Sequence, residues 1–219
     1  MAGLFISFEG GEGGGKSTQV ARLAERLRRA GRAVVTTREP GGTEMAERIR
    51  ELLVTGETDA LSSTGEALLN YAARDDHLRR VIRPALERGE VVISDRFMDS
   101  TRAYQGYAGD CPLSLIEALE RDVVGETVPE MTIILDIDPE EGLRRSRART
   151  GALPLPEAQR EDRFERFGLA FHRRLREAFL RIARENPDRC VVIDAARPED
   201  EVAADVWRAV EPLLERARA

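Results

Sequence analysis

Lysine is almost absent from this chain of 219 residues. Lysine and arginine together number 34, yet Lys16 is the single lysine and all the others are arginines. An exposed lysine can be exchanged for arginine at little cost, but a compact ammonium and a planar guanidinium bind differently. The one remaining lysine therefore predicts a position whose chemistry a guanidinium cannot perform.

Other features are scarce too, and each absence excludes a class of protein. Two cysteines, Cys111 and Cys190, are too few for a disulfide framework, so we expect reduced thiols. No apolar run approaches the roughly 18 residues of a membrane span, and the first residues lack the pattern of a secretion signal. The net charge of −6 lacks the basic excess of a nucleic-acid binder. We expect a cytoplasmic protein that binds neither membrane nor nucleic acid.

What is present favours an ordinary folded domain. Apolar residues make up 42% of the chain and charged residues 34%, which is enough apolar material for a core. The length suits one compact unit, and there is no internal repeat or dividing linker. We therefore expect a single domain over residues 1–219.

Short apolar segments alternate with helical patterns along the chain. The expected strands are residues 4–8, 33–37, 91–94, 131–135 and 190–193. The helical patterns cover residues 20–27, 49–53, 65–88, 113–124, 139–149, 161–186 and 199–217. This alternation predicts a five-stranded parallel sheet with helices on both faces, and functional residues at the carboxyl ends of the strands.

One stretch does not fit this alternation. Residues 150–160 are rich in helix breakers and directly follow an arginine-rich segment, residues 144–149. The pattern predicts a mobile surface loop, and we expect a short lid at about residues 144–160.

The clearest motif lies between the first expected strand and the helix that follows. Residues 10–17, Gly-Gly-Glu-Gly-Gly-Gly-Lys-Ser, match the P-loop pattern G-x-x-x-x-G-K-[ST]. Its glycines let backbone N–H groups point at phosphate oxygens, Lys16 can reach between the β- and γ-phosphates, and Ser17 can ligate Mg²⁺. We expect Gly10, Gly11, Glu12, Gly13, Gly14, Gly15, Lys16, Ser17 and Thr18 to bind ATP, with Ser17 as the metal ligand. The motif does not say what is done with the nucleotide.

The rest of the sequence narrows the class of P-loop protein. A guanine-specific GTPase needs a second lysine in an Asn-Lys-x-Asp motif, and the chain has none. A hydrolytic ATPase usually carries an acidic pair after a strand, but the third expected strand ends in Asp95-Arg96. An arginine there suits a second anion, and transfer between two polyanions needs positioned cations. Arg38, Arg74 and the 144–149 cluster supply more of them.

Several motifs carry a family resemblance. They are Phe8-Glu9-Gly10 before the P-loop, Thr37-Arg38-Glu39-Pro40-Gly41-Gly42, Ala72-Ala73-Arg74, Asp95-Arg96-Phe97-Met98-Asp99-Ser100, Ala103-Tyr104-Gln105-Gly106, Asp162-Arg163-Phe164-Glu165 and Ile193-Asp194-Ala195. With these motifs the chain closely resembles bacterial thymidylate kinases over essentially its whole length. The resemblance implies a P-loop nucleoside monophosphate kinase fold with a short lid.

The resemblance also implies an activity. It is the Mg²⁺-dependent reaction ATP + dTMP → ADP + dTDP, a step toward dTTP, by direct in-line transfer and in a homodimer. Two alternatives stay open at this point. The chain could prefer another monophosphate such as dUMP, or it could be an ATP-binding P-loop module that regulates a partner without transferring phosphate.

The resemblance assigns roles residue by residue. Arg96 is implied to clamp the acceptor phosphate, helped by Arg38 and Arg50, while Arg74 lies over the thymine. The implied substrate-binding residues are Arg38, Glu39, Arg50, Asn70, Arg74, Arg96, Ser100, Thr101, Tyr104 and Gln105. Among them, Thr101 and Gln105 sit where the family contacts the base, and the Tyr104 ring where it crowds the sugar 2′ position.

The implied catalytic residues are Lys16, Arg96, Arg147, Arg149 and Glu12. Because Glu12 is acidic and arginines precede the 150–160 loop, the chain is similar to the variants that carry the catalytic arginine on the lid. Arg145 is implied to bind ATP, and the backbone of residues 195–198 to border the adenine.

The chain departs from the family at one base-binding position. Where the family usually places an aromatic ring that stacks on thymine, this chain has Asn70, with Tyr71 next. One helical step turns a side chain by about 100°, so we expect that Tyr71 does not face the pocket. Base binding then depends more on Arg74 and polar contacts.

Overall fold

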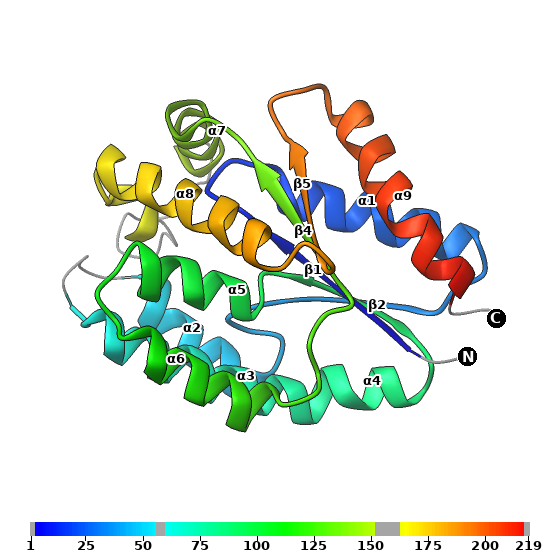
Figure 1. Cartoon of the computed structure of the whole chain (residues 1–219), viewed down its shortest axis with the longest axis horizontal. Coiled ribbons are helices and arrows are strands. Elements are labelled where there is room, and N and C mark those ends of the chain that lie inside the picture. The colour runs from blue at the N-terminus through cyan, green and yellow to red at the C-terminus, as the bar shows by residue number, and fades with distance from the viewer. Residues whose placement is uncertain (1–2, 56–59, 152–162, 217–219) are drawn as a thin grey trace.

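The computed structural model describes residues 3–55, 60–151 and 163–216 (Figure 1). In this part of the chain five strands form one parallel sheet in the order β2-β3-β1-β4-β5. The strands are β1 (Leu4–Glu9), β2 (Val34–Arg38), β3 (Val91–Asp95), β4 (Met131–Asp136) and β5 (Cys190–Asp194). The prediction of a five-stranded parallel sheet is confirmed.

The central strand β1 decides where a ligand can bind. It pairs with β3 on one side and β4 on the other, with Ile6 opposite both Ile93 and Met131. All six residues of β1 are buried, as expected for a parallel strand covered on both faces. Strands β2 and β3 lie on one side of β1, and β4 and β5 lie on the other. The connections therefore run in opposite directions from the centre of the sheet, and the carboxyl ends of β1, β3 and β4 border the crevice where open α/β sheets bind ligands.

Helices cover both faces of the sheet. They are α1 (Lys16–Arg29), α2 (Glu44–Val54), α3 (Ser63–His77), α4 (Arg83–Glu87), α5 (Met98–Thr101), α6 (Leu113–Leu119), α7 (Pro139–Gly151), α8 (Leu169–Glu185) and α9 (Glu199–Arg216). Apolar residues of α1 and α9 pack with β1 on one face, and these two helices lie together on the right of Figure 1. Residues of α3, α6 and α8 form the cores on the other face.

Local sequence signals explain where some helices begin. The Thr43 hydroxyl accepts from the Ala46 N–H at 3.1 Å, and the Ser62 hydroxyl accepts from the Gly65 N–H at 3.1 Å. Such N-caps satisfy backbone donors that the first helical turn leaves free. They fix the starts of α2 and α3, the two helices that follow β2.

The structure differs from the helix predictions in several places. The helix expected over 113–124 is α6 followed by a π-helical segment (Glu120–Val124). The helix expected over 65–88 is α3, a π-helical segment (Leu78–Ile82) and α4 in succession. The predicted start of the helix expected over 161–186 was wrong, because a 3-10 turn (Arg163–Arg166) precedes α8, which begins at Leu169. The helical segment after β3, formed by α5 and a π-helical stretch (Arg102–Tyr107), was missed, since its β-branched and glycine residues weaken the helical pattern.

The expected lid is described only in part. Helix α7 continues to Gly151, two residues beyond the helix predicted over 139–149. The remainder of the predicted lid, residues 152–160, lies outside the described residues. Among the helices that the structure describes, none combines the length and apolarity needed to cross a membrane.

Candidate active site

The P-loop joins β1 to α1 by a backbone path that needs glycine. Gly10 and Gly13 have φ angles of 127° and 70°, in the region that side chains rarely adopt. A Cβ atom at Gly13 would also clash with the backbone of Gly142 at the start of α7. Gly10 and Gly13 are therefore required both for the turn and for close packing, against the backbone of Leu135 and Gly142.

Lys16 is held by the loop that precedes it. Its Nζ donates to the carbonyl oxygens of Gly10 and Gly11, at 3.1 and 2.8 Å, and the residue is 8% exposed. Burial, followed by repulsion from Arg96, lowers the pKa of Lys16 to about 8. The loop thus binds the Lys16 ammonium through neutral carbonyl groups, and the negative charge of a polyphosphate would stabilise it.

Ser17 and Asp95 meet at the start of α1. The Ser17 hydroxyl donates to Asp95 Oδ2 at 2.6 Å, and Asp95 is the last residue of β3. A hydroxyl and a carboxylate beside a phosphate cradle are the hard oxygen ligands that Mg²⁺ prefers. This pair fits a magnesium ion carried by a nucleotide. No group of three or more histidine, cysteine, aspartate or glutamate side chains forms a metal site within residues 3–55, 60–151 and 163–216.

Arg96 turns back over the P-loop because its backbone is strained. Its φ of 71° is unusual for a residue with a side chain, and such a conformation costs on the order of 1–2 kcal/mol. The Arg96 N–H donates to Phe8 O at 2.8 Å, and the Ser94 hydroxyl donates to Arg96 O at 2.7 Å. These bonds hold the turn that brings the guanidinium to Gly10 O, at 3.1 Å.

Glu12 joins Arg96 to Tyr104. Arg96 Nη2 and the Tyr104 hydroxyl both donate to Glu12 Oε1, at 2.8 and 2.6 Å. Burial alone would raise the pKa of Glu12, but the charges of Arg96 and Lys16 hold it at about 2. Glu12 therefore stays ionised and fixes the guanidinium and the phenol ring on either side of it.

Two pockets meet at this cluster. The P-loop pocket is lined by Glu12, Gly13, Gly15, Lys16, Ser17, Arg38, Glu39, Arg50, Asp95, Arg96 and Glu165. The inner pocket is lined by Glu12, Glu39, Pro40, Arg50, Leu53, Val54, Asn70, Arg96, Ser100, Thr101, Tyr104, Gln105, Phe164 and Glu165. The shared lining includes Arg96, Arg50 and Glu12, so an anion in one pocket lies next to the contents of the other.

Arg74 lies behind the wall of the inner pocket and is only 2% exposed. Its Nε donates to Glu39 Oε2 at 2.7 Å, and its Nη2 to Phe97 O and Thr101 Oγ1, both at 3.1 Å. Its Nη1 is buried and has no hydrogen-bond partner among the described residues. The resemblance implies that Arg74 lies over the base, whereas in the structure it lies behind Thr101, a residue that lines the pocket.

Two more predicted arginines line the P-loop pocket, one at the end of β2 and one on α2. Arg38 pairs with Glu47 at 2.9 Å, and Arg50 Nη1 donates to Pro40 O at 2.9 Å. The Glu39–Pro40 peptide bond is cis. Arg38, at the end of β2, and Arg50, on α2, thus converge on one pocket.

Asn70 and Tyr71 take different sides of α3. Asn70 lines the inner pocket, and its Nδ2 donates to Glu66 O at 2.9 Å. Tyr71 is 2% exposed and packs in the core beneath, with the Arg74 guanidinium 4.5 Å from its ring centre. The prediction that Tyr71 does not face the pocket is confirmed.

The arginines of α7 are not together. Arg145 donates to Ala195 O at 3.0 Å and to Ala196 O at 3.3 Å, the backbone expected to border the adenine. Arg147 is exposed and lines a separate hollow between α7 and α8. The side chain of Arg149 lies outside the described residues. A catalytic role for Arg147 or Arg149 stays a prediction.

Sequence reasoning missed three carboxyl groups of the site. Asp95 and Glu165 line the P-loop pocket, and Glu9 lies at the end of β1 with no exposure. Glu9 Oε1 accepts from the Phe97 N–H at 2.8 Å and Oε2 from the Ser100 hydroxyl at 2.5 Å. Burial, with the nearby charge of Asp99, raises the pKa of Glu9 to about 8. Glu9 and Asp95 each end a parallel strand, and that position could have identified them.

A parallel sheet ordered 2-3-1-4-5, a P-loop after β1, and an arginine-lined second pocket define the P-loop nucleoside monophosphate kinase fold. Comparison with known proteins identifies the family within this class. The thymidylate kinase family model matches residues 8–206. The chain belongs to the thymidylate kinase family.

Individual relatives agree with this assignment. A thymidylate kinase of Caulobacter vibrioides is 60% identical over 204 residues, covering 93% of this chain and 94% of the relative. One of Magnetococcus marinus is 50% identical over 213 residues, covering 96% and 97%. The crystal structure of the thymidylate kinase from Ehrlichia chaffeensis superimposes with a TM-score of 0.74 at 35% identity, covering 96% and 99%.

Proposed function

We propose that this protein transfers the γ-phosphoryl group of ATP to dTMP, giving dTDP and ADP. The observation that carries the proposal is the junction of the two pockets at Arg96 and Glu12. ATP phosphates fit the P-loop pocket, and a nucleoside monophosphate fits the inner pocket with its phosphate toward Arg96. The two nucleotides then meet phosphate to phosphate, as an in-line transfer requires.

The residues of the junction offset the repulsion between the two anions. Lys16 neutralises charge on the transferring group, while Arg96, Arg38 and Arg50 hold the acceptor phosphate. An acceptor phosphate oxygen is already ionised at neutral pH, so the reaction needs no strong general base. Catalysis then depends on positioning and electrostatic stabilisation, with no covalent enzyme intermediate.

Ser17 and Asp95 are the residues that would hold the Mg²⁺ of the nucleotide. When bound, the ion supplies positive charge to the β- and γ-phosphate oxygens. The short contact between the Ser17 hydroxyl and Asp95 keeps both oxygens at the mouth of the P-loop.

The inner pocket suits a pyrimidine deoxyribonucleotide. The ring of Tyr104 is fixed by Phe164, 5.2 Å away between centroids, and by its hydrogen bond to Glu12. A ring fixed in this way crowds the sugar 2′ position and favours a deoxyribose. Thr101 and Gln105 supply polar groups for the base, and Arg74 holds the Thr101 hydroxyl from behind the pocket wall. Arg147 and Arg149 remain candidates for closing over the phosphates.

A panel of nucleoside monophosphates tests the function. Purified protein with ATP and Mg²⁺ is given dTMP, dUMP, dCMP, dAMP or dGMP, and ADP release is measured. We expect the highest kcat/KM with dTMP. A preference for dUMP would reassign the substrate, and ATP binding without transfer to any monophosphate would identify a regulatory module instead.

We also propose a homodimer that uses an apolar face of α2 and α3. Met45 and Leu52 on α2 and Leu68 on α3 are 51%, 61% and 49% exposed. Exposed large apolar side chains that gather on neighbouring helices are typical of interfaces. Light scattering should give the mass of two chains, and Leu52→Glu should reduce the measured mass to that of one chain.

A cytoplasmic location stays a prediction.

A further inference from the structure

Gln105 reaches the inner pocket from the π-helical segment after β3, and a carboxyl group holds it from behind. It is 2% exposed, and its Nε2 donates to Glu66 Oε2 at 2.8 Å. Glu66 lies on the facing side of α3 and is 5% exposed. Glu66 does not line either pocket. It therefore acts on the pocket only through the side chain that it binds.

Glu66 is itself half of a buried ion pair. Arg163 Nη2 donates to Glu66 Oε1 at 2.6 Å, and the two side chains are 1% and 7% exposed. Arg163 also donates to Leu53 O at 3.0 Å, and its guanidinium faces the ring of Phe164. A carboxylate that is paired with a buried guanidinium offers only acceptors to its other neighbours.

This pairing decides which way the Gln105 amide is turned. Only the NH₂ group of the amide can donate to a carboxylate, so Nε2 must face Glu66. The other polar atom, Oε1, has no donor bonded to it among the residues that the structure describes, and Gln105 lines the inner pocket. The pocket is therefore presented with a hydrogen-bond acceptor.

We propose that Glu66 is a positioning residue that sets base specificity by fixing the Gln105 amide. An acceptor at Oε1 binds a base edge that carries an N–H donor, as thymine and uracil do at N3. Cytosine has an acceptor at N3, so two acceptors would face each other. This inference rests on the proposed function, because it concerns which pyrimidine monophosphate the inner pocket takes.

Glu66→Gln tests the proposal with little change of shape. A glutamine at this position can turn either NH₂ or C=O toward Gln105, so the amide of Gln105 is no longer held in one orientation. The kcat/KM values for dTMP and dCMP are measured, and their ratio is compared with that of the unchanged protein. We expect the ratio to fall about ten-fold or more, because discrimination depends on a buried acceptor. An unchanged ratio would overturn the proposal.

Two further variants separate specificity from stability. Glu120→Gln disrupts the Arg102–Glu120 pair, which is part-buried and lies outside the inner pocket. We expect this control to leave the dTMP to dCMP ratio unchanged. Gln105→Met removes the acceptor, so adding Glu66→Gln to it should lower the ratio no further. A further fall in the double variant would contradict a role through Gln105.

The experiment stays decisive if Glu66→Gln does not fold. The double variant Glu66→Met/Arg163→Met replaces the whole ion pair, and such apolar replacements are often neutral for stability. It should fold and show the same loss of discrimination, and a ratio that stays high would refute the proposal. Failure of the unchanged protein to phosphorylate dTMP would instead refute the proposed function itself.

Discussion

The two ends of the active site are built in opposite ways. The P-loop end is built around one continuous segment, residues 10–17, which offers a ligand much backbone, and side chains from other elements complete its pocket. The inner pocket takes side chains from the turn after β2, from α2 and α3, from the segment after β3 and from residues 163–166. A cradle of backbone is set by local chain geometry, whereas a pocket of dispersed side chains depends on tertiary packing.

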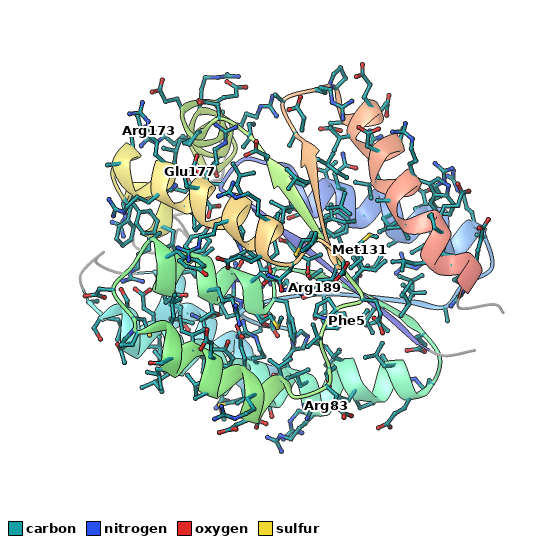
Figure 2. The ribbon with its side chains drawn as sticks, in the orientation of Figure 1. Phe5, Arg83, Met131, Arg173, Glu177 and Arg189 are labelled. Atoms are coloured by element: carbon teal, nitrogen blue, oxygen red, sulfur yellow. The ribbon has the colours of Figure 1, made fainter. Side chains whose placement is uncertain are left out.

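The supports of the two ends differ as well. Buried ion pairs hold the inner pocket: Arg74 with Glu39 at 2.7 Å and Arg163 with Glu66 at 2.6 Å. Arg189, which is labelled in Figure 2 and lies just before β5, forms a third pair with the fully buried Asp99, the residue before Ser100 of the pocket. Breaking a buried pair by removing one partner is strongly destabilising. Changes at the P-loop end should therefore affect chemistry, and changes behind the inner pocket should affect both folding and recognition.

The largest effect is expected at Lys16, where the comparison is simplest. Lys16→Ala should lower kcat by a factor on the order of 10³ or more, because the transferring group loses its nearest cation. Thermal unfolding should change little, because the variant loses two hydrogen bonds but also removes a charge whose burial is unfavourable, as its pKa of about 8 indicates. Steady-state ADP release with dTMP measures kcat, and calorimetry measures thermal unfolding.

Lys16→Arg is the matched control, because it keeps the charge and changes the shape. A planar guanidinium is larger than an ammonium and does not reproduce the position of Nζ between the carbonyls of Gly10 and Gly11, so we expect nearly the same loss of kcat. Near-normal turnover in Lys16→Ala would contradict the proposal that Lys16 neutralises charge on the transferring group. Activity restored by arginine would show that charge alone suffices.

Arg96 sharpens the comparison, because it touches both pockets. Arg96→Ala should lower kcat/KM for dTMP by a factor on the order of 10², since the acceptor phosphate loses a charge-assisted contact. The KM for ATP should change much less, because Lys16 and the P-loop backbone remain. Equal losses for both substrates would mean that the two ends cannot be separated at this residue.

The same contrast explains what could be predicted from sequence. The sheet and the P-loop follow from contiguous patterns, and both were confirmed. An isolated arginine in a sequence is usually solvated, yet Arg74 and Arg163 are among the most buried side chains described. Their partners lie 35 and 97 residues away along the chain. Such pairs form only when the fold brings the helices together, and no local spacing indicates them.

Glu9 gives a prediction about stability at the point where the two ends join. Its pKa of about 8 lies above its ordinary value of 4.5, so the folded state binds a proton more tightly than the unfolded state. This contribution is fully present below pH 4.5 and is lost as pH rises toward 8. The slope from one such group is on the order of 1 kcal/mol per pH unit. Glu9→Gln removes it.

Denaturant unfolding at several pH values from 5 to 9 measures this effect. The difference in unfolding free energy between the unchanged protein and Glu9→Gln should move in favour of the variant as pH rises, and level off above pH 8. Other titrating groups largely cancel in the difference, because both proteins share them. Parallel profiles would show that Glu9 titrates normally.

The smallest effect is expected at Asn70, where the inner pocket departs from its family. Asn70 lines the pocket, and its amide donates a hydrogen bond to the carbonyl oxygen of Glu66 at 2.9 Å. Since it has no aromatic ring, it offers the base no stacking surface. Asn70→Phe should add roughly 1 kcal/mol of stacking and lower the KM for dTMP about five-fold. Steady-state kinetics measure the KM for dTMP. The KM for dUMP is measured for comparison, because a stacking ring contacts the pyrimidine ring of both bases and not the methyl group alone.

A KM for dTMP that is unchanged or raised would mean that Arg74 and the polar groups already hold the base in a position that a ring at residue 70 cannot improve. The inner pocket would then be a distinct way of binding the same base, set by dispersed side chains, while the P-loop end keeps its common form.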